Sequence, residues 1–257
     1  MGLRVCRRSR RAAVVFRLTL TILSGPTDRT CYAPAGSEAD RGVIERIGTA
    51  VYVVLMGAAQ EELVLALETL NQAVLAKLDG LGEYDLRRPL TPTGSTLLGI
   101  VKHLASVQAG YFGDTFARPW PEPMPWLAKN AEINADMFAT ATESSDWVRD
   151  FYCRSWIHAK ETFAVTNLDD TGTVPWWPPE RRHPTLRTVS LHMTVETARH
   201  AGHLDILREM VDGQAGRFEG DPSVPGDDEI HWSEYVAKVD SAAHMAAQGS
   251  STGPISF

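Results

Sequence analysis

The apolar residues of this chain recur at helical spacing in four long segments. Between residues 60 and 81, leucines and a valine return every three or four positions, as on one face of an amphipathic helix. The same spacing occurs in residues 96–116, 147–168 and 185–212. No strand-like alternation of any length accompanies these segments. Four amphipathic helices joined by loops predict an all-α fold, and a four-helix bundle is the natural arrangement, although periodicity alone also allows other helical packings.

Turn-forming and capping residues predict where these helices begin and end. Gly80 and Gly82 are expected to end the first helix, and Gly213 the fourth. Ser95 is expected to cap the start of the second helix, because its hydroxyl accepts a hydrogen bond from a free backbone amide. The four helices are thus predicted to be separated by loops rich in proline, glycine and tryptophan.

The composition predicts three parts of the chain. Residues 1–55 are expected to be a basic extension and linker, residues 56–216 the bundle, and residues 217–257 a largely irregular tail with a short helix around residues 231–246. Residues 129–168 contain neither proline nor glycine, so their composition predicts helix throughout, with one break at the adjacent serines near position 144.

The N-terminal extension has a charge opposite to that of the whole chain. Its first 29 residues hold seven arginines and one acidic residue, whereas the net charge of the 257 residues is −7. Three interpretations stay open: a disordered extension, an arm for membrane surfaces or nucleic acid, and a signal peptide. Arg17 interrupts an apolar run far shorter than the roughly 20 residues of a membrane-spanning helix. The acidic balance argues against nucleic acid and membranes as the main partners.

The cysteines exclude several classes of site. Cys6, Cys31 and Cys153 are odd in number and far apart, so they form neither a CxxC motif nor a disulfide framework. This usage predicts a cytoplasmic location. Cys153 lies among apolar residues of the third predicted helix, where a buried, inert thiol is expected rather than a nucleophile.

A cluster of titratable residues on the fourth predicted helix carries the candidate chemistry. His192, Glu196 and His200 follow one another at intervals of four, so either histidine can bind one ion together with Glu196. His203 lies about 10 Å further along the helix than Glu196, which is too far for the same ion. A protein metal site usually has at least three ligands. His103, among apolar neighbours on the second helix, is the best candidate for the third, although spacing alone also fits hydrogen-bonded core histidines.

Further residues of this helix are candidates for supporting roles. His192 and His203 are candidates for substrate contact or for hydrogen bonds to the ligands. Asp205 is a candidate hydrogen-bond acceptor for a ligand histidine, with an ion pair to Arg208 as the alternative. Arg199 and Arg208 are candidates to bind an anionic substrate, with solvation or salt bridges as the alternative.

Two segments together resemble the signature stretches of the DinB-like superfamily. They read TLLGIVKHLASVQAGYFGDTF and LRTVSLHMTVETARHAGHLDILREMVDGQAG, and the resemblance covers about residues 57–216. It is greatest to an uncharacterised subgroup close to the metal-binding bundle domain of mycothiol-dependent maleylpyruvate isomerase. The resemblance implies a four-helix bundle with a metal site near one end. By motif, it also implies His103, Glu196 and His200 as the ligands.

The resemblance also implies a function. It predicts a divalent metal (zinc first, with nickel or iron as alternatives) and a low-molecular-weight thiol such as mycothiol. The implied activity is a thiol-dependent S-transferase or isomerase acting on small electrophiles. Two alternatives stay open: a non-haem Fe(II) oxygenase-like bundle, which uses the same ligand types, and a non-catalytic, metal-stabilised stress-related binding protein. The expected partners are small molecules and, for a bundle with apolar loops, a second copy in a homodimer.

Overall fold

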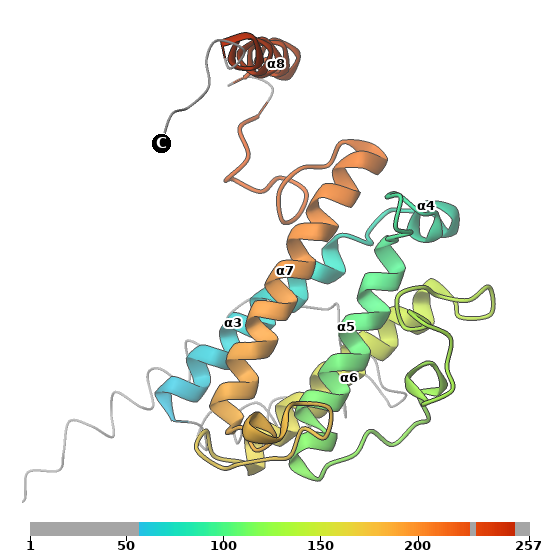
Figure 1. Ribbon diagram of the computed structural model, residues 1–257, viewed down its shortest axis with the longest axis vertical. Coiled ribbons are helices and arrows are strands. Elements are labelled where there is room, and N and C mark those ends of the chain that lie inside the picture. Colours follow the sequence, from blue (N-terminus) through green and yellow to red (C-terminus); the bar gives the residue numbers. More distant parts are fainter. Residues whose placement is uncertain (1–56, 227–229, 250–257) are drawn as a thin grey trace, which may run out of the picture.

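Four long helices form the body of the molecule in the computed structural model, which describes residues 57–226 and 230–249. They are α3 (Ala58–Ala76), α5 (Leu97–Phe112), α6 (Ser145–Val165) and α7 (Leu186–Asp212). Helix α3 packs against α7, α7 against α5, α5 against α6 and α6 against α3 (Figure 1). The buried side chains between the four form two hydrophobic clusters. No strand occurs within the described ranges. The predicted all-α four-helix bundle is therefore confirmed.

Hydroxyl side chains cap three of these helices. The Thr96 hydroxyl accepts a hydrogen bond from a backbone amide in the first turn of α5 at 2.9 Å, and Ser144 and Thr185 cap α6 and α7 in the same way. The cap of α5 is therefore one residue later than the predicted Ser95. Gly213, with a φ of 80°, ends α7 as the sequence predicts, because glycine adopts this left-handed conformation without strain.

The first helix is shorter than its apolar pattern predicts. It ends at Ala76 rather than near residue 81. Charged side chains contact the residues that follow its end. The Lys77 ammonium is buried and lies 2.8 Å from Asp205. The Arg208 guanidinium donates to the carbonyls of Lys77 and Asp79, at 3.1 and 2.8 Å. Arg208 thus takes two carbonyls that a longer helix would bond to its own amides.

The predicted helix over residues 129–144 is wrong. This stretch has an irregular backbone with turns, and Asn134 has a positive φ of 62°. The reason lies in its carbonyl groups. Those of Ala135 and Phe138 accept hydrogen bonds from the buried Lys102 ammonium on α5 instead of from helix amides. A contact distant in sequence therefore overrides the local helical composition.

Two further α-helices and three short 3₁₀-helices (Asp114–Phe116, Pro125–Leu127 and Pro179–Arg181) complete the described residues. Helix α4 (Glu83–Arg87) is a short helix in the predicted loop between α3 and α5. Helix α8 (Trp232–Gly249) lies where the sequence predicts a helix in the tail, and Figure 1 shows it apart from the bundle. Each helix described here is too short or too polar to cross a membrane. The predictions for residues 1–55 lie outside the described residues.

Candidate metal centre

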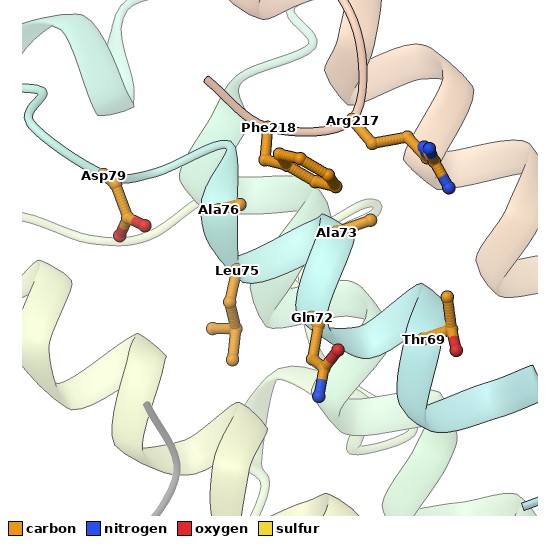
Figure 2. A pocket seen from close by; sticks show the side chains of 8 residues that line it. All are labelled: Thr69, Gln72, Ala73, Leu75, Ala76, Asp79, Arg217 and Phe218. Carbon is orange, nitrogen blue, oxygen red and sulfur yellow. The ribbon is translucent and has the colours of Figure 1, made fainter. Parts of the chain in front are cut away.

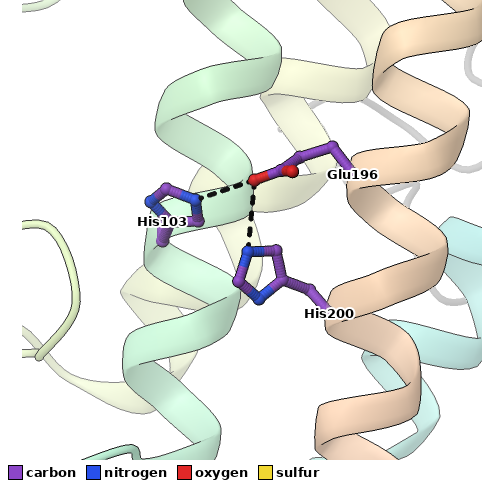
Figure 3. A group of neighbouring side chains, drawn as sticks. All are labelled: His103, Glu196 and His200. Atoms are coloured by element: carbon purple, nitrogen blue, oxygen red, sulfur yellow. Dashed lines mark hydrogen bonds and ion pairs between the residues drawn. The ribbon is translucent and has the colours of Figure 1, made fainter. Parts of the chain in front are cut away.

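Helices α5 and α7 bring the three predicted ligands together (Figure 3). His103 on α5 places its Nε2 atom 3.4 Å from Oε1 of Glu196 on α7, and His200 places its Nε2 atom 3.2 Å from the same oxygen. One ligand atom of each residue lies within 4.8 Å of the other two. The group lies along the seam between the two helices, and each of its side chains is partly exposed. A ligand can therefore reach it from solvent.

The spacing and the chemistry of this group suit a divalent ion. Bonds of about 2.1 Å in a tetrahedral arrangement separate the ligand atoms of one zinc ion by roughly 3.4 Å. The two nitrogen–oxygen separations at Glu196, 3.2 and 3.4 Å, agree with that value. Two imidazoles and one carboxylate are ligands for zinc, and they also form the facial triad of non-haem iron enzymes. The residues present thus fit the group that the sequence predicts.

A second carboxylate, which the sequence did not reveal, contacts the outer side of His103. Asp136 Oδ2 lies 2.6 Å from His103 Nδ1. A neutral imidazole donates through one nitrogen and accepts through the other. When Nδ1 donates to Asp136, the lone pair on Nε2 therefore points toward the Glu196 oxygen, which is also an acceptor. Two acceptors that face each other repel. A cation bound between them removes this repulsion, and so does protonation of His103.

The charges in the group shift the pKa values of its members. Burial alone would lower the pKa of His103, but Asp136 and Glu196 outweigh it and raise that pKa. Burial and the neighbouring His103 charge lower the pKa of His200. Burial would raise the pKa of Glu196, yet its interactions with the two imidazoles lower it, and the hydrogen bond with His103 lowers the pKa of Asp136. Two ionised carboxylates and a neutral His200 are therefore the favoured state near neutral pH.

Comparison with known families identifies the bundle. A family model described as mycothiol-S-transferase matches residues 62–213, which is more than half of the 257 residues and includes α5 and α7. This chain belongs to the mycothiol S-transferase family. The predicted membership of the DinB-like superfamily is thereby confirmed. No curated protein matches the chain.

An aromatic cluster adjoins the ligand group in this mycothiol S-transferase family member. His192, one turn before Glu196 on α7, packs its ring against Tyr111 and Trp177, with ring centroids 4.7 and 5.2 Å apart. The Tyr111 hydroxyl accepts hydrogen bonds from the indole N–H groups of both Trp177 and Trp176, at 2.9 and 3.2 Å. His192 therefore lies beside the ligand group but outside it, and burial lowers its pKa.

The other candidates on α7 have different positions. The His203 Nδ1 atom lies 3.4 Å from Nδ1 of His200, so His203 contacts the outer side of that ligand, as the sequence allowed. The predicted hydrogen bond from a ligand histidine to Asp205 is wrong, because Asp205 pairs with Lys77. The alternative pair with Arg208 is wrong too, since Arg208 pairs with Asp212 at 2.7 Å. Arg199, which the sequence offered for an anionic substrate, is exposed to solvent.

A hollow on the surface of α3 lies away from these residues (Figure 2). Its two charged side chains are already paired: Asp79 with Arg149 at 3.0 Å and Arg217 with Asp221 at 2.8 Å. The rest of its lining is apolar or uncharged. The lining of the hollow therefore offers no unpaired charged group for catalysis or metal binding.

Proposed function

We propose that this chain is a divalent-metal-dependent S-transferase that joins mycothiol, or a similar low-molecular-weight thiol, to a small electrophile. The observation that carries the proposal is the group of His103, Glu196 and His200 in a chain of the mycothiol S-transferase family. Zinc is the metal we propose first, with nickel and iron as alternatives. These three residues would hold the ion, which would leave room beside it for the thiol.

Zinc, when bound, supplies a positive charge that lowers the pKa of a thiol and keeps it as the nucleophilic thiolate. The chain supplies the surroundings. Asp136 holds the proton of His103 at Nδ1, and His200 is neutral because burial lowers its pKa. In the overall reaction, the thiol sulfur bonds to the electrophilic carbon and the leaving group departs with its electron pair. The thiol proton passes to a base, for which we propose His192, since its lowered pKa leaves the ring neutral.

We further propose that the aromatic cluster contacts the organic part of the substrates. Trp176 is 54% exposed, and Trp177 carries the Arg181 guanidinium over its ring at 5.3 Å. The ring faces suit the apolar part of an electrophile, and the guanidinium suits a negatively charged group on it. His192 connects this cluster to Glu196 by one helical turn.

Elemental analysis followed by a conjugation assay tests this proposal. The chain purified from its own host is expected to carry about one zinc, nickel or iron ion. Zinc-loaded protein is then mixed with mycothiol and a haloarene, and the thioether product is measured. Turnover is expected in the parent and in Glu209→Gln, a control at an exposed position of α7, and is expected to disappear in Glu196→Gln.

The remaining outcomes select among the alternative functions. Absence of turnover over a broad panel of thiols and electrophiles would contradict the transferase and favour a metal-stabilised binding protein. Oxygen consumption only by iron-loaded protein would favour the oxygenase-like alternative, which has the same ligand types. The cytoplasmic location and the homodimer stay predictions of the sequence.

A further inference from the structure

We infer that Asp136 is a positioning residue of the metal centre, and that Gly99 and Lys102 on α5 hold the segment that carries it. The inference rests on the metal ligands of the proposed function and goes beyond them, because Asp136 lies in an irregular loop outside the ligand group. Its carboxylate Oδ2 lies 2.6 Å from Nδ1 of His103, the nitrogen on the far side of the ring from Glu196.

Lys102, the residue before His103, binds the Asp136 segment from both sides. Its ammonium group donates to the carbonyls of Ala135 and Phe138 at 3.2 and 3.1 Å, so it bonds on either side of Asp136. It also lies 3.0 Å from a carboxylate oxygen of Glu143. The Lys102 side chain is only 1% exposed, and a charge so deeply buried needs this complete set of partners. Exchanging them would therefore cost free energy, and the segment is held in one place.

Gly99 lets the same segment approach α5 closely. A Cβ atom at Gly99 would lie 1.8 Å from the carbonyl oxygen of Met137, the residue after Asp136. No side chain fits at that distance, so any other residue at position 99 must displace the segment. Lys102 and His103 lie three and four positions after Gly99, so each of them is a neighbour of Gly99 on the surface of α5. This part of α5 both presents the proposed ligand and contacts the loop that orients it.

The hydrogen bond fixes two properties of His103. It selects the tautomer with the proton on Nδ1, so that Nε2 offers its lone pair to an ion beside Glu196. It also restrains rotation of the imidazole ring about its side-chain bonds. Removing a hydrogen-bond partner of a ligand histidine typically lowers metal affinity by about 10–100-fold.

A zinc affinity measurement tests the role of Asp136 without any thiol or electrophile. Competition with a chromophoric chelator gives the Kd of the full chain. Asp136→Ala is expected to raise the Kd by about 10–100-fold, whereas Glu132→Ala, a control at an exposed acidic position of the same loop, is expected to leave it unchanged. Equal affinities for Asp136→Ala and the parent would overturn this inference alone. A parent that binds no zinc would overturn the proposed function as well.

A double-mutant cycle tests whether Gly99 acts through Asp136. Gly99→Ala is expected to weaken zinc binding although it changes no polar group, and Gly99→Ala combined with Asp136→Ala is expected to bind no more weakly than Asp136→Ala alone. Fully additive losses would contradict the shared mechanism. If the Gly99 variant does not fold, as judged by helical circular dichroism, Lys102→Met takes its place in the cycle with the same expected outcome.

The tautomer gives a readout that needs no metal. In metal-free protein at a pH where the ring is neutral, the ¹⁵N shifts of His103 are expected to show the proton on Nδ1 in the parent. In Asp136→Ala they are expected to move toward the proton on Nε2. A merely structural role for Asp136 would leave the tautomer unchanged, and that result would overturn the inference.

Discussion

Helix α7 contributes to two polar clusters of opposite character. The first, here the acid–imidazole cluster, consists of His103, Asp136, Glu196 and His200. The second, here the ion-pair cluster, consists of Lys77, Asp205, Arg208 and Asp212. In the ion-pair cluster each charge has an opposite partner. In the acid–imidazole cluster, two carboxylates contact the same imidazole from its two sides.

The difference lies in the balance of charge. The ion-pair cluster holds two cations and two anions, and Arg208 and Lys77 also bind carbonyls, so its groups are satisfied within the chain. The acid–imidazole cluster holds two carboxylates and no lysine or arginine, and the nearby Lys102 is paired with Glu143. A proton on His103, whose pKa is raised, supplies part of the missing positive charge, and a divalent ion in its place would supply more. We therefore propose metal binding for the first cluster and stability for the second.

The largest expected effect separates the clusters by metal content. His103→Ala removes one of three ligands and is expected to remove most of the bound metal, as measured by elemental analysis after gel filtration. Arg208→Met, in the ion-pair cluster, is expected to keep its metal. Full metal retention by His103→Ala would contradict the ligand assignment.

Metal removal should affect stability through the acid–imidazole cluster alone. An ion present at 100 times its Kd stabilises the folded state by about 2.7 kcal/mol. Chelation is therefore expected to lower the free energy of unfolding of the parent by about that amount, as measured by denaturant titration, and to leave Glu196→Gln unaffected. Equal losses in both proteins would mean that the chelator acts elsewhere.

Breaking the ion-pair cluster is expected to have the complementary effect. Lys77→Met leaves Asp205 without its cation and removes a buried donor, at a cost of about 2 kcal/mol. We take a modest value because Asp205 is 38% exposed and regains water. Urea unfolding with and without metal measures this loss, and zinc affinity should stay at the parent value. A large drop in affinity would show that the two clusters are coupled.

The smallest effect distinguishes the clusters by pH. Zinc must displace the proton of His103, whose pKa is raised above the ordinary value of about 6.5. Affinity is therefore expected to fall as the pH falls through that raised pKa, by up to about tenfold per pH unit from this residue. Asp212, whose pKa is lowered chiefly by its hydrogen bond with Arg208, adds stability that is lost only in acid, as the pH falls through its folded pKa. Zinc affinity that is flat between pH 8 and 6 would contradict the first expectation.

The sequence predicted what depends on contacts within one helix. The four bundle helices follow from apolar periodicity, and Glu196 and His200 lie together because they are one turn apart. His103 was the best candidate for the third member from its place among apolar neighbours, the resemblance of two segments implied the same set, and the structure brings the three together. The spacing along one helix also excluded Glu196 and His203 as a ligand pair, because His203 lies about 10 Å further along the axis.

Contacts between distant segments were beyond the sequence. Asp136 lies 33 positions from His103, on a stretch whose composition favours helix, and contacts from distant residues, those of Lys102 among them, hold that stretch in an irregular form. Neither of the two partners expected for Asp205 was right, because its spacing on α7 says nothing about Lys77, which follows the end of α3. The role of a lone charged residue on an amphipathic helix can therefore be assigned only when its contacts with the neighbouring helices are known.

The bonding of Tyr111 bears on how selective such a protein can be. Both indole N–H groups beside it are already used on its hydroxyl, so the two tryptophans offer ring faces and no directional donors. Such ring faces separate the apolar parts of related molecules by shape, and one methylene changes binding by only about 1–3 kcal/mol. Tolerance toward many electrophiles would then follow from these ring faces, and a narrow specificity would require further polar groups beside them.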